Sequence, residues 1–308
     1  MTEFNFYFAG SMDKHAEQFK IDNDANMLKS WFQDLGSLKD NIQKKKEGKY
    51  KGKILVDSGA FTAHRKDVTI NCEDYIKFLN ENEPYLDAYI QLDQIPGKWG
   101  QERTLEQIKD AEIKSWENYE YMVKNLKNPF KLLAVFHQDE KFENLERLLN
   151  YKIQDKPVEY ICISGAKDRA AKDRTEWYHK CFEVIKYSNN PDVKVHCLGC
   201  STISDLELFP FYSSDSSSWA QQAAFGGIQD KTTLPASSIA LNDADNKYKF
   251  DLVKDQVKAR CEKYGIDYNL IFEKGWARGM YNIGYMLDWV KKGNVGKHFN
   301  PIRAKKLF

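Results

Sequence analysis

Apolar runs rich in β-branched and aromatic residues alternate along the chain with charged segments whose apolar residues recur every three or four positions. The runs predict seven strands, at residues 4–10, 53–61, 87–94, 131–138, 158–166, 194–201 and 208–216. A weaker run at residues 237–243 would supply an eighth strand. Strands that alternate with helices pair in parallel through crossovers, so the pattern predicts an α/β fold. This number of units favours a (β/α)8 TIM barrel, with a doubly wound open sheet as the alternative.

The alternation of strands and helices stops after about residue 245. Residues 250–265 and 283–293 then read as two helices, because their apolar residues follow the helical period. We therefore expect residues 1–245 to form the barrel and residues 246–308 to form a helical C-terminal segment packed on it.

The predicted strands finish in polar or small residues. These are Asp57, Ser58 and Gly59; Asp93; His137 and Gln138; Ser164, Gly165 and Ala166; His196 and Gly199; and Asp215 and Ser216. In a parallel barrel the C-terminal ends of the strands face the active site. The sequence therefore predicts a polar site at one end of the barrel.

Asp57 and Asp215 are the candidates for chemistry. Of two carboxylates in one site, one can attack an anomeric carbon while the other moves a proton to and from the leaving group. Each also has a structural interpretation, because Asp57 opens an Asp-Ser-Gly turn and Asp215 could cap a helix after a serine-rich turn. Asp93 could accept hydrogen bonds from the N–H groups of a guanine-like base, or be an ordinary loop acid.

The charges nearly balance, since 46 Lys and Arg against 45 Asp and Glu give a net charge of +1. This balance excludes the overall basic field that is typical of many nucleic-acid-binding proteins. Residues 44–53 and 291–308 are locally basic, and each run is either a phosphate contact or a solvated surface. We expect positive charge near the barrel mouth from Lys44, Lys45, Lys46, Arg65 and the C-terminal run.

Six scattered cysteines do not form a disulfide framework, which indicates a reduced, cytoplasmic type of compartment. The N-terminal stretch fails as a secretory signal, and no apolar run approaches the roughly 18 residues of a membrane span. Cys197 and Cys200 form a CxxC whose zinc partners are missing, since Cys261 and His298 are isolated, so core packing is the preferred interpretation. The chain also lacks the phosphate-binding GxxxxGK(S/T) motif. We expect neither a metal nor a cofactor.

Six blocks in order resemble the tRNA-guanine transglycosylase superfamily: DSGAF (57–61), QLDQIPG (91–97), VFHQDE (135–140), ISGA (163–166), HCLGCS (196–201) and SSDSSSW (213–219). The resemblance covers roughly residues 4–245 and is greatest to the short phage-type proteins that insert 7-deazaguanine bases into DNA. It implies a TIM barrel that exchanges guanine in DNA for a 7-deazaguanine base, such as preQ0, through a covalent aspartyl-glycosyl intermediate. If phage-encoded, such a protein would act in the host cytoplasm.

The resemblance also implies the roles of individual residues. Asp215 matches the nucleophile, Asp57 the general acid/base, and Asp93 the aspartate that reads the guanine edge. His137 or Gln138 falls where the family has a base-contacting glutamine, and Gly165 and Ala166 stand at a pair that donates backbone hydrogen bonds to the base. The same blocks give the remaining substrate-binding residues and one nucleic-acid-binding residue of the loop around the sugar: Ser58, Phe61, Ser164, His196 and Trp219.

The chain departs from the tRNA enzymes in two places. They carry a zinc site, CxCxxC plus a histidine, after the nucleophile, and the segment GAKDR (165–169) lacks their longer glycine-rich loop. DNA and a 7-deazaguanine base are therefore the expected partners. Base exchange on tRNA, or a repurposed barrel that binds nucleic acid or nucleobase without exchange, are the alternatives. The oligomeric state is left open, a homodimer being one option.

Overall fold

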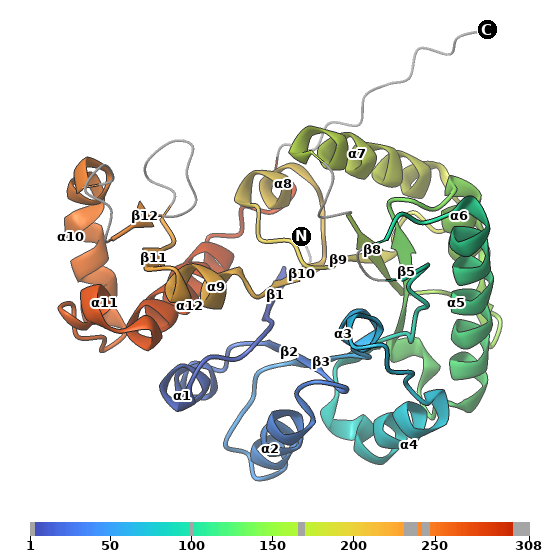
Figure 1. The fold of residues 1–308 in the computed structure, drawn as a ribbon, viewed down its shortest axis with the longest axis horizontal. Helices are drawn as coiled ribbons and strands as arrows, with labels where there is room; N and C mark the ends of the chain where they lie inside the picture. The colour runs from blue at the N-terminus through green and yellow to red at the C-terminus, as the bar shows by residue number, and fades with distance from the viewer. Residues whose placement is uncertain (1–3, 99–100, 166–169, 231–238, 242–246, 298–308) are drawn as a thin grey trace, which may run out of the picture.

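Eight parallel strands close into a barrel in the order β1-β10-β9-β8-β5-β4-β3-β2, and helices surround it (Figure 1). The strands are β1 (Asn5–Phe8), β2 (Met27–Ser30), β3 (Ile54–Asp57), β4 (Ala88–Ile90), β5 (Leu132–His137), β8 (Tyr160–Ser164), β9 (Lys194–Cys197) and β10 (Ser213–Ser216). This computed structural model describes residues 4–98, 101–165, 170–230, 239–241 and 247–297. The predicted TIM barrel is confirmed, and the open-sheet alternative is wrong.

Most of the helices cover the barrel strands on the outside, and the last ones form a lobe beside the barrel (Figure 1). The helices are α1 (Lys14–Asp22), α2 (Leu35–Lys46), α3 (Ala60–Arg65), α4 (Cys72–Asn82), α5 (Leu105–Asn125), α6 (Phe142–Asn150), α7 (Ala171–Tyr187), α8 (Ile203–Leu208), α9 (Ser218–Ala224), α10 (Lys247–Lys263), α11 (Leu270–Glu273) and α12 (Gly275–Lys291). Two single turns, η1 (Glu83–Tyr85) and η2 (Pro129–Lys131), precede β4 and β5, and β6 (Lys152–Ile153) pairs with β7 (Lys156–Pro157). Within the described chain, no helix has the length and apolar character needed to cross a membrane.

The eighth strand of the barrel differs from the prediction. It is β2, whereas β12 (Ile239–Ala240) pairs antiparallel with β11 (Gly227–Ile228) outside the barrel. Lys29 is a charged residue that interrupts the apolar pattern of β2. Its ammonium is fully buried and pairs with Glu17 of α1, with 3.1 Å between Nζ and Oε2. A buried ion pair with a neighbouring helix thus stands where the sequence pattern requires an apolar contact.

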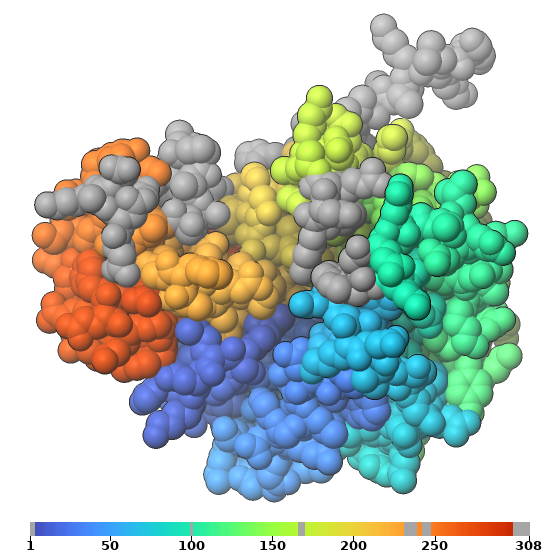
Figure 2. All heavy atoms as spheres, viewed as in Figure 1, coloured from blue at the N-terminus to red at the C-terminus, as the bar shows by residue number. Residues whose placement is uncertain are grey.

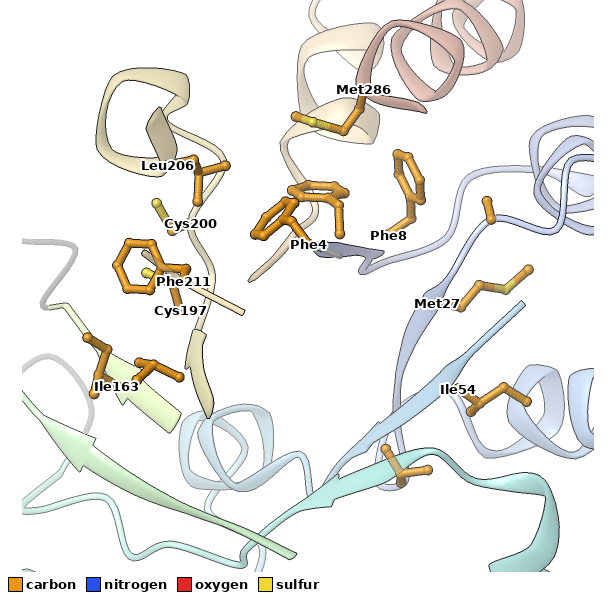
Figure 3. Close-up of a cluster of buried hydrophobic side chains, with 14 of the residues drawn as sticks. Phe4, Phe8, Met27, Ile54, Ile163, Cys197, Cys200, Leu206, Phe211 and Met286 are labelled. Atoms are coloured by element: carbon orange, nitrogen blue, oxygen red, sulfur yellow. The ribbon is translucent and has the colours of Figure 1, made fainter. Parts of the chain in front are cut away.

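Successive side chains of a strand point alternately into the barrel and out toward the helices. In β3, Leu55 belongs to the cluster inside the barrel, whereas Ile54 and Val56 belong to the cluster between strands and helices. Figure 3 shows part of that outer cluster, in which Met286 of α12 points toward Phe4 and Phe8 at the two ends of the β1 region. The strands are therefore apolar on both sides, which explains their nearly continuous apolar sequence.

The C-terminal segment completes the ring of helices. Helix α12 packs against α9, α1 and β1, and so covers the outside of the barrel at β1. With α10, α11 and the β11–β12 ribbon it forms the orange lobe beside the barrel in Figures 1 and 2.

A buried polar network joins this lobe to the segment that follows β10. The side-chain amide of Asn282 donates to the carbonyl of Trp219 (3.0 Å), and its Oδ1 accepts from the backbone N–H of Gln229 (2.7 Å). Arg278, which is also buried, donates to the carbonyl of Ala223 at 2.8 Å. These hydrogen bonds hold α9 against α12, and with it the loop that leaves the end of β10.

Candidate active site

Polar side chains line the barrel mouth, where the C-terminal ends of the strands meet. On four strands they occupy inward positions, two residues beyond an interior residue, as the period of a strand requires. The pairs, interior residue first, are Leu55 and Asp57, Val135 and His137, Cys162 and Ser164, and Ser213 and Asp215. Asp93 follows β4 at the same end and interacts with His137. The fold thus brings the predicted strand-end residues to one face of the barrel.

Asp215 lies at the inner wall of the mouth and is only 5% exposed. Its Oδ1 is held by two donors, the backbone N–H of Gly199 (2.7 Å) and the imidazole Nε2 of His196 (3.1 Å). Within the described part of the chain, no residue donates to its other oxygen, Oδ2. The carboxylate is therefore oriented through one oxygen while the second remains available to a ligand.

The serines around Asp215 allow β10 to be buried on both sides. Ser214, on the outward side, donates from its Oγ to the carbonyls of Cys197, at 2.9 Å, and Cys200. This ties the Cys197–Cys200 turn to β10, and Gly199 at its centre has a φ of 68°, which favours glycine. The turn thereby directs the Gly199 N–H onto Asp215. Ser216 accepts the backbone N–H of Ser218 (3.1 Å), at the start of α9.

Asp57 is the carboxylate with the altered proton affinity. Burial raises the pKa of Asp57 from 3.8 to about 7, and the charges of Asp93 and Asp215 add to the rise. The backbone N–H of Gly59 donates to Oδ2 at 3.1 Å and opposes the effect. Like charges around one partly desolvated cavity disfavour the ionisation of each carboxylate. Asp57 is therefore suited to take up and release a proton near neutral pH.

Asp93 and His137 form a hydrogen-bonded pair, with 2.9 Å between Oδ2 and Nε2. Burial lowers the pKa of His137, but the hydrogen bond and charge of Asp93, with the charges of Glu140 and Asp139, outweigh it, so that the pKa is raised overall. The backbone N–H of His137 also donates to Glu140 at 3.0 Å. The pair thus presents a carboxylate whose Oδ2 is fixed by an imidazole whose protonated form is favoured by its surroundings.

The other predicted substrate-binding residues lie at or below the same mouth. Ser58 is buried and accepts the N–H of Ala60 (3.3 Å), whereas Phe61 of α3 is 48% exposed. Ser164 pairs with His137 in the register of β8 and β5. Gln138 reaches the carbonyl of Asp173 at 3.5 Å.

Gly165 and His196 are enclosed by their surroundings. A Cβ at Gly165 would lie 2.7 Å from the side chain of Arg174, so this position has no room for a larger residue. His196 is fully buried beneath Asp215 and bonded to it. Ala166, the second residue of the predicted backbone-donor pair, lies outside the described residues.

Trp219 differs from the prediction that it contacts nucleic acid. It is 1% exposed and packs behind the mouth, where its indole N–H donates to the carbonyl of Ala9 (2.8 Å). The buried ammonium of Lys20 lies 4.9 Å from the centre of its ring. Trp219 therefore anchors the start of α9 to the end of β1 rather than facing a ligand.

The lysines predicted at the mouth, Lys44, Lys45 and Lys46, lie at the opposite end of the barrel. They end α2 just before β3 begins, whereas Asp57 is at the other end of β3. Lys45 forms an ion pair with Asp87 (2.6 Å), the residue that precedes β4. Arg65, in contrast, ends α3 and follows β3, so it belongs to the mouth side. The C-terminal run from residue 298 onward is outside the described residues.

The cysteines considered above as candidate zinc ligands, Cys197, Cys200 and Cys261, are not grouped around a common site. Across the described ranges, no group of three or more His, Cys, Asp and Glu side chains is placed to hold a metal ion. Cys197 and Cys200 are both buried in the core, where the thiol of Cys197 contacts the hydroxyl of Tyr178 (3.2 Å). Cys261 is buried elsewhere, and His298 is outside the described residues. The CxxC sequence here builds the turn that supports Asp215.

Two polar groups of the site escape sequence reasoning, Tyr160 and Ser213. Ser213 bonds to His196 Nδ1 at 2.6 Å and to the hydroxyl of Tyr160, all inside the barrel. The signal available in the sequence is strand phase, since Ser213 lies two residues before Asp215 and must point the same way. Tyr160 could not be found in this manner, because its partner is on a strand that is two positions away in the barrel.

Comparisons with known proteins add no family to this picture. No family model matches the chain, and a search of curated proteins finds no match.

Proposed function

We propose that this protein is a base-exchanging transglycosylase that replaces guanine in DNA by a 7-deazaguanine base, through a covalent bond between Asp215 and C1′ of the sugar. One observation carries the proposal, namely two carboxylates in one barrel mouth with different environments. Asp57 holds a proton near neutral pH, whereas Asp215 is oriented through Oδ1. The six ordered blocks that resemble guanine transglycosylases support the same reaction.

The first half-reaction breaks the bond to the original base. An electron pair of Asp215 Oδ2 forms a bond to C1′, and the pair of the C1′–N9 bond leaves with guanine. The departing base takes the proton of Asp57, which becomes a carboxylate. A pKa of about 7 suits this step, because a large share of Asp57 is still protonated at neutral pH.

The second half-reaction transfers the sugar to the new base. The incoming base gives its N9 proton to the Asp57 carboxylate, and N9 attacks C1′. The electron pair of the C1′–Oδ2 bond returns to Asp215. Both carboxylates finish in their starting states, so the exchange balances with these two residues alone.

Recognition of the base is assigned to the pair of Asp93 and His137. A guanine edge offers two adjacent donors, N1–H and the exocyclic amine, and a carboxylate accepts from both. His137 fixes Oδ2 of Asp93 at 2.9 Å, which orients the carboxylate. Glu140 and Asp139 raise the pKa of His137 further and so strengthen the pair.

Access to C1′ imposes a condition on the nucleic acid. In a duplex the target nucleotide must leave the stack before Asp215 reaches its sugar, because the base and C1′ are otherwise covered. Phe61 and Arg65 on α3 lie on the mouth side and supply an aromatic ring and a positive charge there. These are the residue types that stabilise an unstacked nucleotide and its phosphates.

The test is nucleoside mass spectrometry on DNA and tRNA from cells that express the chain and receive a 7-deazaguanine base. We expect a deazaguanine deoxynucleoside with the wild type, and none with Asp215→Asn. Asp155→Asn is the matched control, since Asp155 lies in the exposed β6–β7 turn with a φ of 65°, which Asn also tolerates. Modified tRNA with unmodified DNA would reassign the substrate, and no modification of either would reject the exchange reaction.

A further inference from the structure

His196 lies at the centre of a buried hydrogen-bond chain that ends on Asp215. The hydroxyl of Tyr160 bonds to Ser213 Oγ, Ser213 Oγ lies 2.6 Å from His196 Nδ1, and His196 Nε2 lies 3.1 Å from Asp215 Oδ1. All four residues are at most 8% exposed. The ring also meets Tyr7 and Tyr160 edge to face, with centroids 6.1 and 6.5 Å away.

The donor and acceptor of each hydrogen bond in this series can be assigned from its two end residues, Tyr160 and Asp215. Among the described residues, Ser213 Oγ is the one acceptor within reach of the Tyr160 hydroxyl, so the phenol donates to Ser213. Ser213 then donates to Nδ1, which must be an acceptor. Nε2 therefore carries the hydrogen of a neutral imidazole and donates it to the Asp215 carboxylate. Every donor in the chain is used once in this arrangement.

We infer that His196 is a positioning residue that gives the two oxygens of Asp215 different tasks, with Oδ1 held and Oδ2 free to bond C1′. The inference rests on the proposed function and deepens it. The Gly199 N–H shares the holding of Oδ1 at 2.7 Å, so the carboxylate is fixed from two directions. In the covalent intermediate Oδ1 becomes the ester carbonyl, and Oδ2 is the ester oxygen on C1′.

Loss of the His196 donor should slow the second half-reaction more than the first. When the C1′–Oδ2 bond breaks, negative charge returns to the carboxylate, and the donors on Oδ1 stabilise it as it develops. Removal of the His196 donor leaves attack by the carboxylate possible, but it makes Asp215 a poorer leaving group. The covalent intermediate should then persist, whereas a residue that only fills space would slow both halves alike.

The experiment measures the halves separately with a guanine-containing DNA oligonucleotide. Adduct formation is followed by guanine release, and adduct turnover by adding a 7-deazaguanine base to the isolated adduct. With His196→Leu, which fills the space without a donor, we expect turnover to slow by about 10- to 100-fold relative to formation. His196→Gln keeps an amide donor near the position of Nε2 and should restore most of the loss.

Two controls keep folding and function apart. Rates are expressed per active site, from the amount of adduct formed in a single burst, so misfolded protein does not contribute. Equal slowing of both halves in His196→Leu, with no rescue by Gln, would overturn the inference. Absence of any adduct in the wild type would instead reject the proposed function itself, and the positioning role with it.

A second readout needs no catalysis. Nitrogen-15 NMR of histidine-labelled protein reports which ring nitrogen carries the proton, and the His196→Gln variant assigns the signal among the six histidines. We expect the Nε2–H form for His196, with Ser213→Ala shifting the Nδ1 signal. An Nδ1–H form or a doubly protonated ring in the wild type would contradict the proton direction on which the inference depends.

Discussion

Asp57 and Asp215 share the barrel mouth closely enough for the charge of Asp215 to affect the ionisation of Asp57. The pKa of Asp57 is raised to about 7, first by burial, then by the charge of Asp93 and then by the charge of Asp215. Asp57 is the last residue of β3 and Asp215 the last but one of β10, and these strands are separated in the barrel by β1 and β2. Burial, Asp93 and Asp215 together keep a share of Asp57 protonated near neutral pH. A proton donor and a nucleophile can coexist in one site only if their proton affinities differ in this way.

This relationship predicts the pH dependence of base release. Only protonated Asp57 can give a proton to the departing guanine, so single-turnover release should fall about tenfold per pH unit above 7. The measurement is a rapid-quench series from pH 6 to pH 9 on one oligonucleotide. Asp57→Asn should be slow throughout and lack this inflection. A wild-type rate that is constant across the range would contradict the acid role of Asp57.

Asp57 should also make the folded protein less stable at high pH. Its pKa is raised from 3.8 to about 7 on folding, so the folded protein binds this proton more tightly than the unfolded chain. Its contribution to stability is thus present below pH 3.8 and is lost as pH rises through 7. The stability gain of Asp57→Asn over the wild type should therefore be about 2–3 kcal/mol larger at pH 8 than at pH 5, by urea denaturation. An equal difference at the two pH values would contradict this.

The buried cluster of Lys20, Lys29 and Glu17 should dominate the stability of the β1–α1 region. Glu17 pairs with Lys20 at 2.7 Å and with Lys29 at 3.1 Å, and both lysines are fully buried. Glu17→Gln leaves two buried ammonium groups without a counter-charge, which should cost about 3–5 kcal/mol in urea denaturation at pH 7.

The pH dependence of the wild-type stability provides a second test of this cluster. Burial lowers the pKa of Lys20 to about 8, with the charge of Lys29 acting in the same direction against Glu17. The folded protein therefore binds this proton less tightly than the unfolded chain, and stability should rise with pH from about 8 toward 10.5. The rise should vanish in Lys20→Met. A loss in Glu17→Gln below 1 kcal/mol would indicate that water reaches the cluster.

The affinity for nucleic acid should depend on positive charge at the mouth of the barrel and not on positive charge at the opposite end. Arg65 is on the mouth side, whereas Lys51 precedes β3 at the opposite end and serves as a matched control. Arg65→Ala should weaken binding of single-stranded DNA and reduce the salt slope by about 1, while Lys51→Ala leaves both unchanged. Fluorescence anisotropy at several salt concentrations measures this. Equal effects of the two substitutions would contradict binding at the mouth.

Much of this fold was predictable because the barrel strands are apolar on both sides and end in polar residues. That pattern locates seven strands and places Asp57, Asp93, His137 and Asp215 at one face. It fails for β2, where the buried Lys29 pairs with a glutamate of α1, since an ion pair across two elements leaves no local signal. The failure at Lys44–Lys46 has a simpler cause: residues before a parallel strand lie at the end opposite the site.

The hydrogen bonds at the site were beyond sequence reasoning. Gly199 and His196 are found as strand-end residues, but that both bind the same oxygen of Asp215 depends on the turn after β9 and on strand register. The buried position of Trp219 likewise depends on α12, which follows it by more than fifty residues. Strand phase and strand ends are local properties, whereas shared partners are tertiary ones.

The most direct test of the central claim is to map the covalent adduct. The protein is incubated with a guanine-containing DNA oligonucleotide, quenched, digested with protease and nuclease, and analysed by tandem mass spectrometry. We expect a deoxyribose-bearing peptide modified at Asp215 and at no other residue, lost on addition of a 7-deazaguanine base. An adduct on Asp57, or guanine exchange without any adduct, would contradict it.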